Sequence, residues 1–281
     1  RLENVDQYLG GTDGSDVLIG DGGNDTLLGG NGDDYLLPGA GADTVEGGNG
    51  ISDMLGVGYT TGQQPDQALI VDLELGQSTN DGFGSIDIIN DVEDVLGTSF
   101  GDTILGDAMP NLLVGAHGND VIDGRGAGDL IWGGAGNDTL TGGIGSDLLI
   151  FATASSRLFS DAFKETFPAL LFGDRGAIAN LSTGLVTDEF GDTDTISGFE
   201  NVIGSDFGDH FTGTAFDNYF IGEDGDDTLL GQGGDDTLEG DDGADNLDGG
   251  DGNDRLEGSN GDDTINGGDG EDYAAYFNAA A

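Results

Sequence analysis

The residues of this chain that could do chemistry are aspartates that recur every nine residues. From Gly11 the chain reads GTDGSDVLI, GDGGNDTLL, GGNGDDYLL, PGAGADTVE and GGNGISDML. Two further arrays in the same pattern start at Gly97 and Gly204, and the three arrays hold nineteen nonapeptides, sixteen of them with Asp at place six. Carboxylates and loop carbonyls offer only oxygen ligands, which suit Ca²⁺ and do not suit zinc or copper. The pattern therefore predicts a series of calcium sites.

The composition excludes several classes of partner. The chain of 281 residues has 56 acidic and six basic residues, 57 Gly, no Cys and a formal net charge of -50. Nucleic acid and anionic membrane surfaces repel such a chain, so neither is expected as a partner. Absent Cys excludes disulfides and thiolate metal sites. No apolar run approaches the ~18 residues of a membrane span, and we expect none.

The elements that must position the aspartates follow from the other places of the repeat. Gly at places one, two and four allows backbone conformations that a Cβ forbids, which predicts a tight six-residue loop. Place eight is apolar, and a short strand over places seven to nine sends that side chain inward and its neighbours outward. Two loops and two strands make a flattened coil of eighteen residues, whose copies stack as parallel strands about 4.8 Å apart. The inward residues include Leu18, Leu27, Leu36, Val45, Ile122, Ile131, Leu140, Leu149, Leu229, Leu238, Leu247, Leu256 and Ile265.

Stacking of this kind places the place-six aspartates of successive coils beside one another. Asp16 and Asp34, for example, fall on the same edge one coil apart. Two bare carboxylates at that spacing repel by about 0.9 kcal/mol in water and about 3.5 kcal/mol at an effective dielectric of 20. A thin core with one inward residue per nine does not outweigh a ladder of such pairs, whereas a cation between the loops reverses the sign of the electrostatic energy.

The nonapeptides resemble those of the repeats-in-toxin (RTX) hemolysin-type calcium-binding family, whose signature is G-G-x-G-x-D-x-U-x with U a large apolar residue. The resemblance implies an all-β parallel β-roll, a two-sheet β-solenoid, in which each ion lies between loops i and i+2. It implies place-six ligand pairs at Asp16/Asp34, Asp25/Asp43, Asp120/Asp138, Asp129/Asp147, Asp227/Asp245, Asp236/Asp254, Asp245/Asp263 and Asp254/Asp272. It further implies backbone carbonyl ligands from the Gly-rich places, namely Gly30, Gly32, Gly118, Gly136, Gly225, Gly234, Gly243, Gly252, Gly261 and Gly270.

Several loops depart from the repeat. Ser52 stands at place six and Asp53 is shifted by one, which puts the site shared with Asp34 in doubt. Asn111 and Asn218 replace Asp at place six. We expect the first two coils of the second and third arrays to be packed by apolar bulk and to bind little calcium, because the place-four Gly is replaced there by Phe100, Met109, Phe207 and Phe216.

A longer period of about 107 residues is superimposed on the short one. Residues 68–106 align with 177–213 after a small gap, and the chain starts within the pattern, so we expect a piece of a longer tandem array. An amphipathic helix capped by Ser155 is predicted up to Phe172, either as a cap on a roll end or as an anchor for a partner. The expected division is β-roll 1–55, spacer 56–96, β-roll 97–150, spacer with a short helix 151–203, β-roll 204–275 and the start of another spacer 276–281.

No residue set indicates catalysis, and we expect that the chain is not an enzyme. Gly97-Thr98-Ser99-Phe100-Gly101 fits the nucleophile elbow G-x-S-x-G, but it lies in the nonapeptide register. Trp132 stands at place nine and is expected to project outward, where it could stack on a sugar.

Two functions remain open from the sequence. The first is a calcium-stiffened structural repeat of a secreted or cell-surface bacterial protein, exported by a type I system and folding in extracellular calcium, as the resemblance implies. The second is a non-catalytic accessory module of a secreted enzyme, similar to those of alginate epimerases, proteases or lipases. Expected partners are several Ca²⁺ ions, other copies of the chain or extracellular polysaccharide, and a weaker third hypothesis is calcium-driven self-assembly through exposed strand edges.

Overall fold

The computed structural model describes residues 4–57, 64–151 and 173–275, and in this part of the chain the regular secondary structure is β. Its internal contacts divide the chain into two compact units, Arg1–Gly133 with Asp138–Gly145 and Gly134–Asn137 with Ser146–Ala281. The helix predicted from Ser155 to Phe172 lies outside the described residues. Among the residues described, there is no helix of the length and apolar character needed to cross a membrane.

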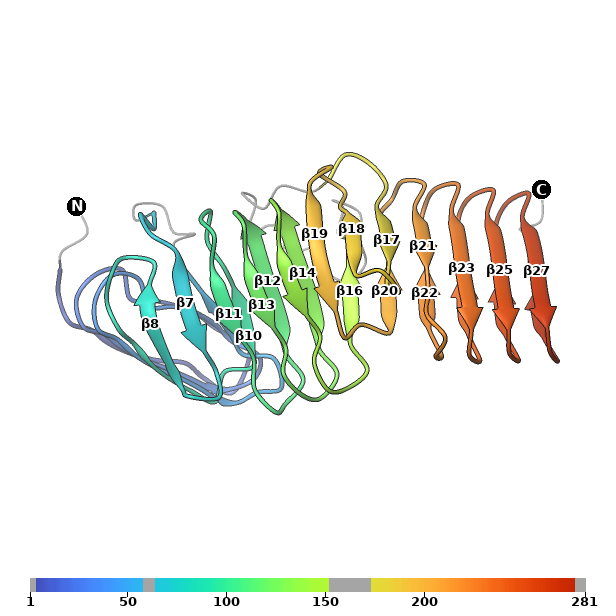
Figure 1. The fold of residues 1–281 in the computed structure, drawn as a ribbon. Helices are drawn as coiled ribbons and strands as arrows, with labels where there is room; N and C mark the ends of the chain where they lie inside the picture. Colours follow the sequence, from blue (N-terminus) through green and yellow to red (C-terminus); the bar gives the residue numbers. More distant parts are fainter. Residues whose placement is uncertain (1–3, 58–63, 152–172, 276–281) are drawn as a thin grey trace. The chain divides into compact units, whose positions relative to one another are not determined.

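The first unit is a parallel β-solenoid with two sheets, A and B (Figure 1). Sheet A has the order β1 (Tyr8–Gly10), β3 (Thr26–Asn31), β5 (Thr44–Asn49), β9 (Ile88–Asn90), β8 (Gln77–Asp81), β7 (Leu69–Asp72), β11 (Thr103–Leu105), β13 (Val121–Asp123) and β15 (Thr139–Thr141). Sheet B has the order β2 (Val17–Ile19), β4 (Tyr35–Leu37), β6 (Met54–Gly56), β10 (Asp94–Leu96), β12 (Leu112–His117) and β14 (Leu130–Ala135).

The second unit repeats this architecture. Its part of sheet A has the order β19 (Thr193–Ser197), β18 (Leu185–Thr187), β17 (Ile178–Asn180), β21 (His210–Thr212), β23 (Thr228–Gly233), β25 (Asn246–Asp251) and β27 (Thr264–Asp269). Its part of sheet B has the order β16 (Leu148–Ile150), β20 (Asn201–Ile203), β22 (Tyr219–Ile221), β24 (Thr237–Glu239), β26 (Arg255–Glu257) and β28 (Tyr273–Ala275). The β-solenoid predicted from the nine-residue period is therefore confirmed.

The core of each unit is the row of place-eight side chains. Strands one coil apart pair in parallel, so that Leu229 lies beside Leu247 in sheet A and Leu238 beside Leu256 in sheet B. The prediction that place eight points inward is confirmed, because these side chains are 0–2% exposed at Leu27, Leu36, Val45, Ile104, Leu113, Ile122, Ile131, Leu140, Leu149, Phe211, Phe220, Leu229, Leu238, Leu247 and Leu256. In the terminal strands β2 and β27, by contrast, Leu18 and Ile265 are only half-buried.

The segments between the arrays are three-stranded insertions in sheet A. In the first unit β8 pairs antiparallel with β7 and with β9, while in sheet B the strand β6 pairs directly in parallel with β10. In the second unit β18 pairs antiparallel with β17 and β19, and β16 pairs in parallel with β20. The two segments aligned by the longer period thus share one topology, and in each unit sheet B continues past the insertion.

Arg125 fastens the first insertion to the coil that follows it. Its guanidinium donates two hydrogen bonds of 2.8 Å to the Asp72 carboxylate and lies 3.0 Å from Glu74. It also donates to the carbonyl oxygen of Gly106 at 2.8 Å. The hydrogen bonds from Arg125 lower the pKa of Asp72. The ion pair therefore holds the turn between β7 and β8 in place.

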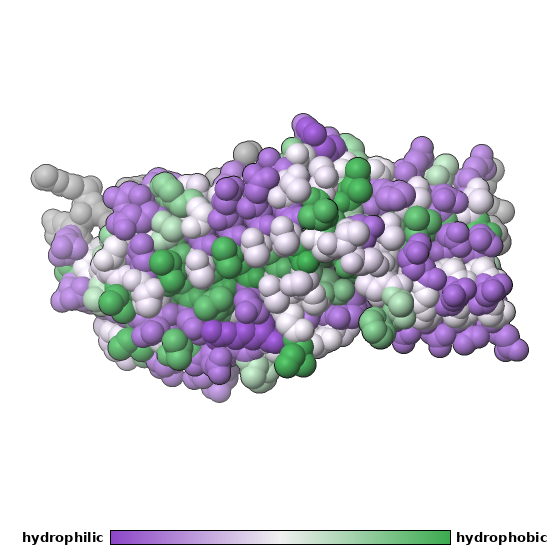
Figure 2. Space-filling model, viewed as in Figure 1, coloured by the Kyte–Doolittle hydropathy of each residue, from purple (hydrophilic) through white to green (hydrophobic). Residues whose placement is uncertain are grey.

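The expectation that Trp132 projects into solvent is wrong, since it is 1% exposed. In the same sheet the place-nine residues Leu96 and Val114 pair one coil apart and are 0% exposed. Large apolar side chains at place nine adjoin along the outer face of sheet B and form a second buried layer. On the outer face of sheet A, by contrast, Ile70 and Val121 stay partly exposed, and Figure 2 shows apolar residues gathered over β7, β11 and β13.

Truncation of a place-eight side chain tests the assignment of the core. We expect Leu238→Ala to lower the free energy of unfolding by about 2–5 kcal/mol, because it leaves a cavity in a closely packed row. The matched control is Leu185→Ala, since Leu185 is 54% exposed. The measurement is the shift of the urea midpoint in saturating calcium. Equal shifts for the two variants would contradict the assigned core.

Candidate metal centre

The place-six aspartates form ladders along the edges of both units. The backbone N–H of each donates to Oδ1 of the aspartate one coil later, at 2.8 Å for Asp16 to Asp34 and 2.7 Å for Asp25 to Asp43. The same bond, at 2.8–3.1 Å, joins the predicted pairs Asp120/Asp138, Asp227/Asp245, Asp236/Asp254, Asp245/Asp263 and Asp254/Asp272. The structure thus brings these predicted pairs together, and their role as metal ligands stays a prediction.

The eighth predicted pair is divided between the units, because Asp129 belongs to the first and Asp147 to the second. Within its own unit, Oδ1 of Asp129 accepts a hydrogen bond of 2.9 Å from the N–H of Asn111. The N–H of Asp147 donates at 3.0 Å to Oε2 of Glu200. Each aspartate therefore takes part in the ladder of its own unit.

The loops fall into two classes, according to whether the second carboxylate oxygen (Oδ2) of the place-six aspartate has a hydrogen-bond partner. In the glycine-rich loops, Oδ2 is buried and accepts no hydrogen bond, as at Asp34 and Asp236. A buried polar atom without a partner costs free energy, and a buried carboxylate costs more unless a cation pairs with it. The same atom is unpartnered at Asp25, Asp43, Asp53, Asp227, Asp245 and Asp254.

Asp263 and Asp272 lie in the predicted ladder positions but are less buried than the inner aspartates, and their role as metal ligands stays a prediction. Asp263 is only half-buried and Asp272 is exposed. Neither carboxylate therefore has the buried, unpartnered Oδ2 that is found at Asp245 and Asp254. The physical reason is that the inner ladder carboxylates are covered by the coil eighteen residues later, and within the described residues no such coil follows Asp263 or Asp272. Asp263 and Asp272 occupy the expected ladder positions, but burial does not favour a cation there as it does in the inner loops.

A carbonyl oxygen lies next to several of the buried carboxylates. A Cβ added at the place-one residue Gly29 would collide with Oδ2 of Asp34 and with the carbonyl oxygen of Gly47, one coil later. At Gly231 it would collide with Oδ2 of Asp236 and with the carbonyl oxygen of Gly249. The small cradle left by the place-one glycine is therefore lined by oxygens from two coils.

The glycines predicted as carbonyl ligands shape the same loops. A φ of 110–151° is found at Gly30, Gly32, Gly118, Gly136, Gly225, Gly234, Gly252, Gly261 and Gly270, whereas Gly243 lies outside this region. Residues with a Cβ rarely adopt such a φ. The sequence therefore needs glycine at these places to turn the loop around the carboxylate.

Burial and crowding raise the pKa values of the ladder carboxylates. Burial, together with the charges of Asp209 and Asp245, raises the pKa of Asp227 from 3.8 to about 8. Burial also raises the pKa of Asp43 and Asp236 to about 7, with further contributions from Asp25 and Asp254. Without a cation, the protein therefore favours the protonated form of these groups near neutral pH.

In the second class of loops, the place-two residue of the loop itself donates hydrogen bonds to the place-six carboxylate. The N–H of Thr98 donates to Oδ2 of Asp102 at 2.5 Å, and its hydroxyl donates to Oδ1 at 2.8 Å. Ser205 makes the equivalent bonds to Asp209 at 2.7 and 3.0 Å. A hydroxyl residue at place two thus satisfies both oxygens of the carboxylate in these loops. Thr12 also donates from its N–H and its hydroxyl to Asp16, in this case both to Oδ2.

The two loops with asparagine at place six close in a related way. The side-chain amide of Asn111 donates to the carbonyl oxygen of Glu93 at 2.7 Å, and that of Asn218 donates to the carbonyl oxygen of Glu200 at 2.8 Å. The side chain of an aspartate in either place would have no N–H to donate. The amide therefore makes a direct bond to the preceding coil.

The expected packing by apolar bulk in these coils is wrong. Phe100 is 38% exposed, and Phe207 is 41% exposed. Met109 and Phe216 are more exposed still, at 60% and 77%. The hydrogen bonds from place two and from asparagine close the coils instead, and the expectation of little calcium there remains a prediction.

Some ladder residues were missed by the sequence analysis. The N–H of Asp34 donates to Oδ1 of Asp53 at 2.8 Å, and Tyr35 pairs with Met54, so the loop absorbs one extra residue and the ladder continues. Glu93 is the next member, since its Oε2 accepts a hydrogen bond of 3.0 Å from the N–H of Asp53. The buried strand residue Leu55, two places after Asp53, was the signal that could have restored the register.

These residues fit calcium better than other metals. Ca²⁺ takes six to eight oxygen ligands, and a pair of carboxylates supplies at most four. Among the described residues, no group of three or more His, Cys, Asp or Glu is arranged to hold a metal. An ion between two coils would therefore be held by paired aspartates together with loop carbonyls, and it would neutralise their charge.

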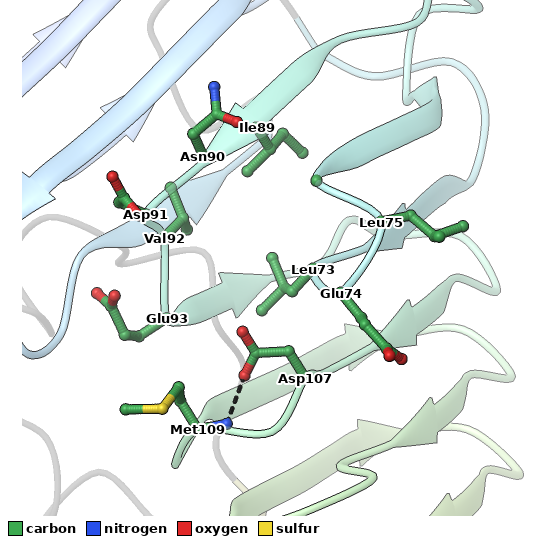
Figure 3. Close-up of a pocket in the computed structure, with 11 residues that line it drawn as sticks. Leu73, Glu74, Leu75, Ile89, Asn90, Asp91, Val92, Glu93, Asp107 and Met109 are labelled. Atoms are coloured by element: carbon green, nitrogen blue, oxygen red, sulfur yellow. Dashed lines mark hydrogen bonds between the residues drawn. The ribbon is translucent and has the colours of Figure 1, made fainter.

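A hollow of about 370 Å³ lies beside the first insertion (Figure 3). Leu73, Ile89 and Val92 line it together with four acidic side chains, of which three have partners within the protein. Glu74 pairs with Arg125, Glu93 accepts from Asp53, and Asp107 accepts from the N–H of Met109. The hollow is therefore a structural feature of the insertion.

The segment from Gly97 to Gly101, which fits the motif G-x-S-x-G, lies in a roll loop in which Thr98 donates to Asp102.

Comparison with known families agrees with the geometry. The family model for the RTX calcium-binding nonapeptide repeat (4 copies) matches residues 10–45, 96–130, 118–149, 203–238 and 239–274. These ranges together cover more than half of the chain. No curated protein sequence matches it.

Filling one cradle tests the site geometry. We expect Gly231→Ala to raise the calcium concentration at the midpoint of folding at least tenfold, because a Cβ there collides with the Asp236 carboxylate and the Gly249 carbonyl. The control is Gly14→Ala, since a Cβ at Gly14 meets no atom within 4 Å. The measurement is a calcium titration followed by circular dichroism. Equal calcium midpoints for the two variants would exclude the cradle as a binding site.

The raised pKa values predict how the metal-free protein responds to pH. Asp227, with a pKa of about 8, and Asp43 and Asp236, with pKa values of about 7, titrate near 3.8 when unfolded. Groups with raised folded pKa values stabilise the fold at low pH and lose that contribution as pH rises through those values. In calcium-free buffer we therefore expect β-structure to increase from pH 8 to pH 5. A metal-free protein that is most folded at pH 8 would contradict this.

Proposed function

We propose that this chain, which belongs to the family of RTX calcium-binding nonapeptide repeats, is a structural region of a secreted or cell-surface bacterial protein. On this proposal the region folds and stiffens on binding Ca²⁺. The observation that carries the proposal is the set of buried, unpartnered carboxylate oxygens, several of which, as at Asp34 and Asp236, lie beside a carbonyl oxygen of the next coil. The ion would hold neighbouring coils together through these oxygens.

The physical basis is the balance between a thin core and a large charge. The net charge of -50 opposes compaction, and each coil adds further carboxylates to the ladders. A metal ion that binds the folded chain and not the unfolded one adds its binding free energy to the free energy of unfolding. The chain would stay unfolded where calcium is scarce and fold where it is abundant. This behaviour suits a chain exported unfolded by a type I system into millimolar calcium.

The structural role is proposed over the accessory module because the same unit recurs. The two insertions share one strand topology, and repetition of a solenoid unit lengthens a spacer without adding a new site. On this proposal the chain has no catalytic role, and other copies of itself or extracellular polysaccharide are its expected partners. A catalytic domain encoded beside these units would favour the accessory module instead.

A calcium titration tests the proposed function. We expect circular dichroism to show a mostly unfolded chain in chelator and β-structure after addition of millimolar Ca²⁺. Mg²⁺ is expected to be far less effective, because it demands octahedral geometry at shorter distances and gives up water reluctantly. A spectrum that is unchanged by chelation, or that Mg²⁺ restores equally well, would contradict the proposal.

A further inference from the structure

The loop that ends the first insertion replaces a nonapeptide loop of the roll. Residues 82–90 read GFGSIDIIN, with Asp87 at place six and the buried Ile89 at place eight. Ile89 pairs in parallel with Val45, and the N–H of Asp43 donates to Oδ1 of Asp87 at 2.9 Å. The ladder thus continues from loop 38–43 into this loop, which lies outside the residues matched by the family model.

Asp81, which precedes this loop, has a carboxylate with one satisfied and one unsatisfied oxygen. Its Oδ1 accepts hydrogen bonds from the N–H groups of Phe83 at 2.9 Å and Ser85 at 2.8 Å. Its Oδ2 is buried without a hydrogen-bond partner, and the residue is 1% exposed. An asparagine could cap the same turn without burying a charge. The turn alone therefore does not explain the choice of aspartate.

Asp81 lies in the electrostatic field of two other buried carboxylates. Burial, together with the charges of Asp81 and Asp43, raises the pKa of Asp87 to about 7. Asp81 likewise contributes to the raised pKa of Asp43. In Asp87 the two oxygens already accept from Asp43 N–H and from the Ser78 hydroxyl. The two unpartnered oxygens of the group are therefore Oδ2 of Asp43 and Oδ2 of Asp81.

The second unit contains the same arrangement at the equivalent place. The sequence D-x-F-G-x-x-D occurs at 81–87 and again at 188–194. Oδ1 of Asp188 accepts from the N–H groups of Phe190 at 3.0 Å and Asp192 at 2.7 Å. Its Oδ2 is buried without a partner, and Asp188 is 1% exposed. An orphaned buried carboxylate oxygen therefore recurs with the motif.

We propose that the D-x-F-G-x-x-D loop binds a further Ca²⁺ ion, held in the first unit by Asp43 Oδ2 and Asp81 Oδ2, with Asp87 adding negative charge. Backbone carbonyls and water would complete the ligand set. Asp188 has the role of Asp81 in the second unit. The inference extends the calcium chemistry of the nonapeptides to a loop outside them, so it rests on the proposed function. The ion would clamp each insertion onto the roll.

The test is a crystal structure of the full chain grown in calcium, with anomalous difference maps measured at long wavelength. We expect a peak within about 2.3–2.6 Å of Asp81 Oδ2, in addition to peaks at the nonapeptide loops. Peaks at the nonapeptide loops without one at Asp81 would overturn this inference and leave the proposed function intact. A folded chain with no calcium peaks at all would overturn both.

Variants give a second measurement with an internal control. Asp81→Asn keeps an oxygen that can cap the turn and removes the charge, so we expect the peak at this loop to disappear while the nonapeptide peaks remain. Asp66→Asn, which alters an exposed carboxylate nearby, is expected to keep every peak. An undiminished peak in Asp81→Asn would overturn the assignment of Asp81 as a ligand. If that variant does not fold, the wild-type map alone decides the question.

Discussion

The structure depends on one constraint, which is that parallel stacking of identical coils brings identical side chains together. For the place-eight residues this is favourable, because Leu229 and Leu247, or Leu238 and Leu256, meet in a dry row. For the place-six residues it is unfavourable, because carboxylates are buried one coil apart and their pKa values rise, as at Asp227. The same period therefore builds the core and the electrostatic strain, and neither can be removed without loss of the other.

Much of the fold could be predicted from the residues because the same nonapeptide pattern recurs many times in the sequence. The nine-residue period placed the inward residues, the eighteen-residue coil and the aspartate pairs such as Asp25 and Asp43. What escaped prediction are features that occur once or twice. The antiparallel insertion strand β8 forms a hairpin with β7 that does not follow the nine-residue period, and Asp53 rejoins the ladder only because the loop before it accommodates an extra residue. Trp132 is buried although it stands at place nine, which a single nonapeptide does not reveal.

The chemistry of place two also had to be seen in three dimensions. Thr98 and Ser205 stand at place two, where the repeat has glycine, and their N–H and hydroxyl groups satisfy both oxygens of the place-six carboxylate. Where the place-two residue makes no such bonds, as at Gly30 before Asp34, the buried Oδ2 of the carboxylate is left without a hydrogen-bond partner. A single substitution at place two thus distinguishes a loop that closes by itself from one that is suited to an ion.

The amide bond from Asn111 to Glu93, and from Asn218 to Glu200, has a consequence for how the solenoid assembles. A covalently attached amide does not dissociate when the surrounding ion concentration falls. In a one-dimensional stack each coil interacts mainly with its neighbours, so winding can start at any stable step and propagate. The asparagine rungs are such steps, one in each unit and close to its insertion. In each unit this one contact between coils therefore does not depend on a bound ion.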